Sequence, residues 1–123
     1  MRIGIMGAGG IGSVVGGLLS QAGHDITLID QWPEHVNKIK TDGLVVDHRG
    51  NKTLVNPKAI HLHELQLETG LFDAVFIAVK SYDTEWATTM MLRYVDPLYG
   101  VFVNFQNGIN DERMAAIAGV KRS

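Results

Sequence analysis

The pattern of hydrophobic and polar positions changes twice within the first 30 residues. An apolar run at Ile3–Met6 stops at a cluster of glycines, which is typical of a buried strand that ends in a tight loop. Apolar residues then recur three and four positions apart over Ile11–Ala22, which predicts a helix with Gly23 as its C-terminal stop. A β-branched, apolar segment at 26–29 ends at Asp30. These residues therefore predict a strand, a helix and a second strand.

The following stretch predicts a second helix and a hairpin. Residues 33–41 begin with proline, which suits the first turn of a helix, and Gly43 supplies the stop. Two apolar, β-branched segments at 44–46 and 53–55 flank a turn at 48–51 that contains Gly-Asn. We expect this hairpin to be an edge element of the fold.

Strands and helices continue to alternate in the second half of the chain. Residues 59–69 predict irregular structure with about one helical turn, and the near-continuous apolar run at 73–79 predicts a strand covered on both faces. A helix at 82–94 ends where the chain reaches Asp-Pro, because the residue before proline avoids the helical region. A strand at 101–105 then precedes a last short helix at 110–118.

This alternation predicts the fold class. Parallel neighbours need crossover connections, and these turn right-handed. The expected fold is therefore α/β: a Rossmann-type, doubly wound parallel sheet with helices on both faces and a small β-hairpin insertion. A length of 123 residues suits one domain with one layered core, so we assign residues 1–123 to a single domain.

Composition removes several classes of function. The chain is 46% hydrophobic and 20% charged, which is ordinary for a folded globular protein. A formal net charge of -2 gives no basic field for phosphate backbones, so no nucleic-acid partner is expected. The lack of cysteine excludes disulfides and thiolate metal sites and fits a cytoplasmic location. No apolar run approaches the roughly 20 residues of a membrane span, so we expect no membrane partner.

The glycine cluster after the first strand matches the pattern G-x-G-x-x-G. It lies between a strand and a helix, the context in which this pattern binds the diphosphate of a dinucleotide. In that role Gly7 allows a tight turn, Gly9 lets the main chain approach the diphosphate, and Gly12 lets helix and strand pack closely. The alternative is a glycine-rich turn that serves backbone geometry alone. We predict that the cofactor-binding loop consists of Gly7, Ala8, Gly9, Gly10, Ile11 and Gly12.

Asp30 stands 18 residues after Gly12, at the end of the second predicted strand. An acidic residue there accepts hydrogen bonds from the adenosine ribose of NAD. The 2′-phosphate of NADP would set like charges together, at a cost of about 4 kcal/mol for each unit pair at an effective dielectric near 20. The favoured cofactor is therefore NAD(H), a preference that Lys38 or Arg49 would weaken by reaching the site. The alternative role of Asp30 is to cap the turn after the strand.

Two further motifs follow predicted strands: Val-Lys-Ser-Tyr-Asp-Thr at 79–84 and Asn-Phe-Gln-Asn-Gly-Ile at 104–109. Together with the glycine loop, and in this order, they make the chain resemble the ketopantoate reductase (2-dehydropantoate 2-reductase) family from Met1 to Gly119. The resemblance implies an NAD(P)H-dependent reduction of a 2-oxo acid to a 2-hydroxy acid by hydride transfer. Ketopantoate and pantoate are the pair in the members that give the family its name, in pantothenate biosynthesis.

The same resemblance implies roles for two residues. Lys80 would line the cleft near the nicotinamide side, and Asn107 would contact the nicotinamide ribose and the substrate. Both follow predicted strands, and open α/β sheets bind ligands beyond the carboxyl ends of their strands. The alternatives are a strand-end lysine that extends into water and an Asn-Gly turn that tolerates positive φ. His61 and His63 lack a third ligand, so no metal site is predicted.

The chain departs from the family pattern in two respects. Members that prefer NADPH resemble one another in a basic residue just after the second strand, where Asp30 and Gln31 stand here. A preference for NADP(H) is therefore an expectation of the resemblance alone. The family's catalytic lysine and substrate-binding residues lie on a helical carboxy-terminal domain, and we expect that domain to be absent from this chain. Without it, the chain would bind cofactor with negligible turnover, and the catalytic residues are not identified.

These features lead to one functional hypothesis and two rivals. Residues 1–123 form the dinucleotide-binding domain of a reductase whose partners are the cofactor and a small 2-oxo acid. Another two-domain dehydrogenase, of the opine or 3-hydroxy acid type, would share the loop but not the substrate. A regulatory module that senses NAD would require neither Lys80 nor Asn107. An apolar face left bare by a missing domain would also favour self-association, such as a homodimer.

Overall fold

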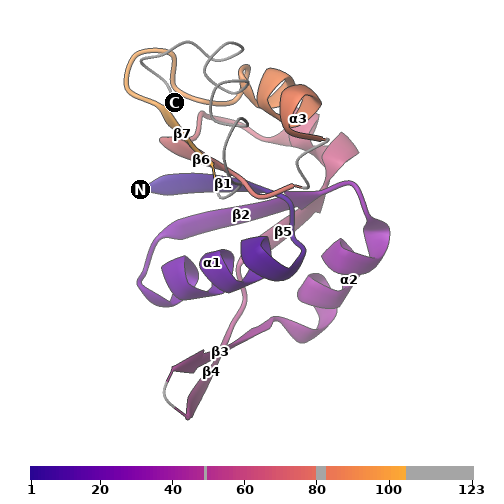
Figure 1. The fold of residues 1–123 in the computed structure, drawn as a ribbon, viewed down its shortest axis with the longest axis vertical. Helices are drawn as coiled ribbons and strands as arrows, with labels where there is room; N and C mark the ends of the chain where they lie inside the picture. Colours follow the sequence, from indigo (N-terminus) through magenta and orange to yellow (C-terminus); the bar gives the residue numbers. More distant parts are fainter. Residues whose placement is uncertain (49, 80–82, 105–123) are drawn as a thin grey trace.

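Five parallel strands form the main sheet of the computed structural model, which describes residues 1–48, 50–79 and 83–104 (Figure 1). Each strand pairs in parallel with its neighbours. From one edge to the other, the order is β5 (Lys58–His61), β2 (Asp25–Asp30), β1 (Arg2–Met6), β6 (Ala74–Ile77) and β7 (Val101–Asn104).

Helices cover both faces of this sheet. Ile5 and Leu28 point into a core on one face, and their neighbours Met6 and Ile29 point into a second core on the other, because successive side chains of a strand alternate between faces. The predicted doubly wound α/β fold is confirmed. The first core lies under α1 (Gly10–Gln21) and α2 (Pro33–Asp42), and the second under the 3₁₀ helix η1 (Leu62–Leu67) and α3 (Thr84–Met91).

Glycines end the first two helices, as the sequence predicts. Gly23 follows α1 with a φ of 95°, and Gly43 follows α2 with a φ of 70°. Both lie in the left-handed region, which glycine adopts without steric cost. The helix α2 buries Val36 and Ile39 against the sheet, as the apolar spacing requires.

The helix α1 rests on the sheet through glycines. Its buried residues are Gly12, Gly16 and Gly17, whereas Ile11 and Val14 are exposed. A methyl group on Gly16 would lie 3.0 Å from Leu28 Cδ2, so the helix approaches the strands more closely than larger residues would allow. This close approach holds the first turn of α1 beside the carboxyl ends of β1 and β2.

The interpretation of 59–69 as irregular is wrong at its beginning. Lys58–His61 form β5, the edge strand, which pairs with β2 from Thr27↔Lys58 to Asp30↔His61. The predicted helical turn is present as η1 directly afterwards. Ala59 and Ile60 are the buried residues of β5, so the segment has too few apolar positions to show a strand period. Pairing with β2, which is distant in sequence, makes it a strand.

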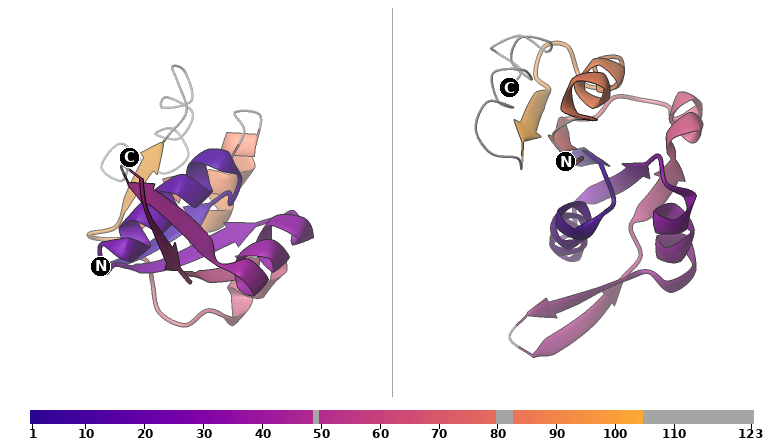
Figure 2. Two further views of the ribbon diagram at one scale, coloured as in Figure 1. Left: turned by 90° about the horizontal axis from the view of Figure 1, so that it is seen from below. Right: turned by 45° about the vertical axis from the view of Figure 1, so that its right-hand side comes forward.

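The predicted hairpin is confirmed, but its place as an edge element is not. Strands β3 (Leu44–His48) and β4 (Asn51–Val55) form a separate two-stranded antiparallel sheet, and β5 occupies the edge of the main sheet. The hairpin extends away from the main sheet beside α1 (Figures 1 and 2). A methyl group on Gly17 would lie 3.1 Å from Val46 Cγ2, so packing on α1 anchors the hairpin.

Two other elements are present but shorter than predicted. The strand expected at 73–79 spans Ala74–Ile77, and the helix expected at 82–94 spans Thr84–Met91. The strand expected at 101–105 is described from Val101 to Asn104, and its last residue lies outside the described residues. The helix expected at 110–118 lies outside the described residues. Within the described ranges, no helix combines the length and the apolar character that crossing a membrane requires.

Candidate functional site

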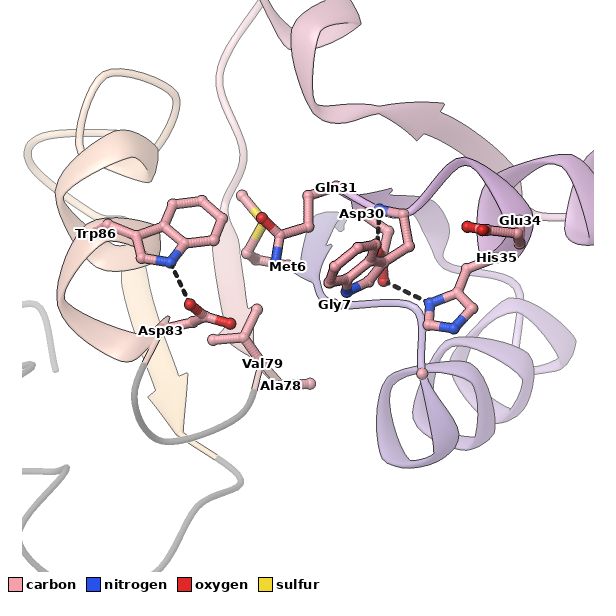
Figure 3. A pocket seen from close by; sticks show the side chains of 12 residues that line it. Met6, Gly7, Asp30, Gln31, Glu34, His35, Ala78, Val79, Asp83 and Trp86 are labelled. Carbon is pink, nitrogen blue, oxygen red and sulfur yellow. Dashed lines mark hydrogen bonds and ion pairs between the residues drawn. The ribbon is translucent and has the colours of Figure 1, made fainter.

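A cleft of about 440 Å³ lies at the carboxyl ends of β1, β2 and β6 (Figure 3). The chain order reverses here, because β2 and β5 lie on one side of β1 while β6 and β7 lie on the other. Ligands of open α/β sheets bind at such a reversal. The described residues that line the cleft are Met6, Gly7, Gly9, Asp30, Gln31, Trp32, Glu34, His35, Ala78, Val79, Asp83 and Trp86.

Gly7 and Gly12 give the loop between β1 and α1 its shape. Gly7 has a φ of 112°, and a methyl group there would lie 2.8 Å from the carbonyl group of Ala78. A methyl group on Gly12 would overlap the carbonyl oxygen of Gly7. Glycine is therefore required at both positions, for backbone conformation at one and for space at the other. The Gly7 N–H donates to the Ile29 carbonyl at 2.7 Å and holds the loop against β2.

Gly9 leaves the start of α1 open. A methyl group added at Gly9 or Gly10 would meet no atom within 4 Å, and no side chain caps the helix. The Ser13 N–H donates to the Gly9 carbonyl at 2.9 Å, so the N–H groups of Gly10, Ile11 and Gly12 precede the intrahelical hydrogen bonds. An uncapped helix N-terminus that begins with two glycines fits a diphosphate, which binds to main-chain N–H groups and the helix dipole.

Asp30 is buried at the end of β2, with 5% of its surface exposed. Its Oδ2 accepts a hydrogen bond from the Ala8 N–H at 2.6 Å and lies 3.1 Å from His35 Nδ1. Its Oδ1 accepts a hydrogen bond from the Trp32 N–H at 2.7 Å, which is the turn cap that the sequence offers as an alternative role. The Ala8 N–H is thus occupied by Asp30. Each carboxylate oxygen accepts two hydrogen bonds, so Oδ1 keeps an accepting position.

The opposite wall of the cleft comes from β6 and the start of α3. The Trp86 Nε1–H donates to Asp83 Oδ1 at 2.7 Å, which fixes the indole ring across the cleft from Asp30 and His35 (Figure 3). The Ala78 N–H donates to the Met6 carbonyl at 2.9 Å, and this bond keeps the ends of β1 and β6 together. The cleft therefore has one wall built on an aromatic ring and one built on a buried carboxylate.

The described part of the lining is acidic. Asp30, Glu34 and Asp83 supply carboxylates and His35 supplies an imidazole, whereas no lysine or arginine belongs to it. Lys38, which would weaken a preference for NAD, does not line the cleft. A ligand group with a high negative charge therefore meets no lysine or arginine among the described lining residues.

Several predicted residues stay untested by this geometry. Lys80, Asn107 and Arg49 lie outside the described residues, so the roles predicted for them remain predictions. The side chain of Ile11 is 57% exposed, and this residue belongs to the predicted loop through its main chain.

The sequence pattern does not identify Trp32, His35 and Trp86 as site residues. One signal was available for His35: it stands in the first turn of α2, the helix that follows β2. The first turn of such a helix faces the strand ends, where the ligand of this fold binds. Trp86 has no comparable signal, because its place at the cleft depends on how α3 packs on the sheet.

The histidines considered as metal ligands have a different arrangement. The rings of His61 and His63 stack with their centroids 5.5 Å apart and an interplanar angle of 14°. In the described ranges, no cluster of three or more potential metal-ligating side chains is found. His63 lines a second hollow of about 420 Å³, together with Arg93 and Tyr94, which shares no residue with the cleft at the strand ends.

Comparison with known sequences supports the resemblance. Residues 3–122 match the family model described as "Ketopantoate reductase PanE/ApbA". The 2-dehydropantoate 2-reductase of Pyrococcus horikoshii is 34% identical over 120 residues, which are 97% of this chain and 37% of that protein. The corresponding protein of Pyrococcus abyssi is 38% identical over 112 residues, 91% of this chain and 35% of that protein. The chain thus spans a little over a third of the length of these curated relatives.

Solved structures agree with this assignment. A PanE/ApbA family ketopantoate reductase from Ralstonia eutropha matches with a TM-score of 0.80 and 30% identity, over 95% of this chain and 38% of that one. D-mandelate dehydrogenase, solved with NADH and anilino(oxo)acetate, matches with a TM-score of 0.83 and 25% identity, over 99% of this chain and 38% of that one. The match over almost the whole chain, on a Rossmann-type sheet with an open glycine loop, shows that the chain belongs to the ketopantoate reductase family and forms its amino-terminal NAD(P)-binding domain.

Proposed function

We propose that the cleft binds NAD(H), with the diphosphate at the start of α1. The observation that carries this proposal is the uncapped helix N-terminus at Gly9, which opens at the chain reversal and where a methyl group on Gly9 or Gly10 would meet no atom within 4 Å. The N–H groups of Gly10, Ile11 and Gly12 are the donors that would hold the anion. The Ala8 N–H takes no part, because it donates to Asp30.

The adenosine end of the cofactor would lie beside Asp30. The accepting position left on Oδ1 suits a ribose hydroxyl, and a hydrogen bond to a charged acceptor contributes about 1.5–3 kcal/mol. The carboxylates of Asp30 and Glu34 stand on this side of the cleft, and the described lining holds no lysine or arginine. They favour the hydroxyl of NAD(H) over the 2′-phosphate of NADP(H) by charge repulsion.

The nicotinamide end would extend toward the carboxyl ends of β6 and β7. By family resemblance, Lys80 lines the cleft there, and Asn107 contacts the nicotinamide ribose and the substrate. Trp86 and Val79 contribute an apolar surface to this side of the cleft, which excludes water from a bound ring. The bound cofactor supplies the hydride, while the domain binds and orients it.

For the whole protein we propose reduction of a small 2-oxo acid to a 2-hydroxy acid, as in the 2-dehydropantoate 2-reductases to which this chain is similar. A helical carboxy-terminal domain would add the general acid that protonates the developing alkoxide, along with the substrate-binding residues. We expect the enzyme to work in the cytoplasm, where it would draw on the cellular pool of nicotinamide cofactor.

Titration of the protein with NADH and with NADPH tests the cofactor assignment. We expect NADH to bind at least about tenfold more tightly at neutral pH, since that ratio corresponds to only about 1.4 kcal/mol of repulsion. Tighter binding of NADPH would overturn the preference assigned to Asp30. Binding of neither nucleotide would overturn the proposed cleft.

Assay of the full-length protein against a panel of oxo acids tests the reaction. The likeness to D-mandelate dehydrogenase makes an aromatic 2-oxo acid the second candidate substrate beside ketopantoate. Turnover of ketopantoate above all others supports the first assignment, and a preference for the aromatic acid supports the second. A full-length protein that reduces no 2-oxo acid, yet binds NADH, would point to an opine or 3-hydroxy acid dehydrogenase or to a module that senses NAD.

A further inference from the structure

Two donors from different segments share one oxygen of Asp30. The Ala8 N–H reaches Oδ2 at 2.6 Å from the glycine loop, and His35 Nδ1 lies 3.1 Å from the same oxygen. An ionised carboxylate only accepts hydrogen bonds, so Nδ1 carries a proton in this contact. The second ring nitrogen of His35 points away from Asp30 and is the one whose protonation changes the charge of the ring.

His35 stands at the surface of the cleft, unlike the carboxylate that it contacts. Its side chain is 44% exposed, against 5% for that of Asp30. It belongs to the first turn of α2 and faces the cleft beside the glycine loop (Figure 3). The ring can therefore exchange a proton with solvent while it keeps its contact with the buried carboxylate.

Carboxylates face His35 from more than one element. Asp30 of β2 contacts it, Glu34 precedes it on α2, and Asp83 stands on the opposite wall. The start of α1 lines the same cleft through Gly9 and adds the positive end of its helix dipole. Lys38 of α2 is not part of the lining. Among the described lining residues, His35 is thus the side chain that becomes cationic when it gains a proton.

We propose that His35 is a specificity-determining residue whose protonation state sets how strongly the cleft rejects the 2′-phosphate of NADP(H). The proposal rests on the proposed function, in which the adenosine ribose lies beside Asp30. With a neutral ring, the Asp30–His35 pair carries one negative charge and repels the phosphate. With a protonated ring, the pair is neutral overall and His35 offers the phosphate a charged donor.

The rejection of NADP(H) therefore depends on pH. Histidine is the side chain whose ordinary titration falls between about pH 5 and 8. NADH has no 2′-phosphate, so its affinity changes little as His35 gains a proton, whereas NADPH binds more tightly as the pH falls. The 2′-phosphate itself loses charge near about pH 6, and this contribution is the same for any variant.

The test compares the protein with two variants at about pH 8 and about pH 5.5. H35Q keeps a hydrogen-bond donor for Asp30 but does not titrate, and H35K stays positively charged at both pH values. The quantity measured is the ratio of the dissociation constants of NADPH and NADH. When the pH is lowered from about 8 to about 5.5, we expect this ratio to fall about tenfold more in the unaltered protein than in H35Q. In H35K we expect the ratio to be low at both pH values.

The possible results separate failure of the role of His35 from failure of the proposed NAD(H) binding. An equal fall of the ratio in the protein and in H35Q would overturn the role of His35, as would an H35K variant that rejects NADPH as strongly as the unaltered protein at the higher pH. If neither nucleotide binds to any of the three proteins, the proposed function itself fails.

A measurement on the unaltered protein covers the case in which a variant does not fold. NMR titration of the His35 ring gives its pKa with NADPH bound and with NADH bound. By linkage, a ligand that prefers the protonated ring raises the pKa of that ring. A higher pKa with NADPH than with NADH is the expected result, and equal values would overturn the proposal.

Discussion

The main-chain N–H of Ala8 donates a hydrogen bond of 2.6 Å to Oδ2 of Asp30, 22 residues further along the chain. This bond joins the glycine loop directly to the end of β2. The glycine loop, which we assign to the diphosphate, and Asp30, which we assign to the ribose, are therefore mechanically connected. A change at Asp30 disturbs the loop as well as the ribose contact.

Replacement of Asp30 by Asn tests this connection. An asparagine has one accepting oxygen in place of two, so either the Ala8 N–H or the Trp32 N–H loses its acceptor. We expect the D30N protein to lose about 1–3 kcal/mol of unfolding free energy, because a buried donor is left without a partner. We also expect NADH affinity to fall about tenfold or more and the discrimination against NADPH to shrink.

Asp25 provides the matched control for that variant. It stands at the opposite, exposed end of the same strand, away from the residues that line the cleft. D25N removes the same charge from the protein and should leave cofactor selectivity unchanged, as measured by titration with both nucleotides. If D25N and D30N alter selectivity equally, net charge rather than the local geometry controls it.

Alanine at Gly9 separates cofactor binding from folding. The added methyl group meets no protein atom within 4 Å, and Gly9 already has an extended backbone with a φ of -76°. Thermal unfolding should therefore be nearly unchanged, while NADH affinity falls because the methyl group stands where the diphosphate approaches. G10A keeps its main-chain N–H, and Gly10 does not line the cleft, so its effect on affinity should be smaller.

Alanine at Gly12 should act through the fold instead. Its methyl group would overlap the carbonyl oxygen of Gly7, which is main chain and cannot move without the loop. We expect G12A to lower the unfolding free energy by about 1–3 kcal/mol or more. Denaturant unfolding of G9A and G12A in parallel measures the contrast, and equal stabilities would show that the loop yields easily.

The glycine loop could be predicted from the sequence because its requirements are local. Gly7, Gly9 and Gly12 have the three properties expected of them: positive φ, open space and close packing. The ends of α1 and α2 could be predicted for the same reason, since Gly23 and Gly43 act within one turn of each helix. Steric rules that involve only neighbouring residues can be read from a single sequence.

The parts that sequence analysis missed depend on contacts between distant segments. The edge strand β5 has two buried residues and exists through its pairing with β2. Trp86 reaches the cleft because α3 packs on β6, and its hydrogen bond to Asp83 fixes the ring there. The contact of His35 with Asp30 likewise requires that α2 fold back over the end of β2.

Phe72 should be a main contributor to stability on one face of the sheet. It is 1% exposed, its ring lies 3.1 Å from the position of a Cβ on Gly4, and the Arg2 guanidinium lies 4.5 Å from its centroid. We expect F72A to cost about 3–5 kcal/mol of unfolding free energy through the cavity that it leaves. The neighbouring Leu71 is 45% exposed, so L71A should cost less than about 0.5 kcal/mol. Denaturant unfolding of both variants checks the difference.

Glu64 should make stability depend on pH in the acidic range. Its carboxylate accepts a hydrogen bond of 2.8 Å from the His61 N–H and lies 3.3 Å from Lys40 Nζ. The His61 N–H, followed by Lys40, holds the pKa of Glu64 below its ordinary value of 4.5.

A group whose pKa is lowered by folding stabilises the protein above its unfolded-state pKa, and this contribution is lost as the pH falls through its folded-state pKa. The protein should therefore be more stable than E64Q at neutral pH, and the difference should shrink as the pH falls below 4.5. Unfolding free energies measured across that range check the sign, with E34Q as a control for the loss of one carboxylate. A difference between the protein and E64Q that stays constant with pH would show that the charge of Glu64 does not make the contribution.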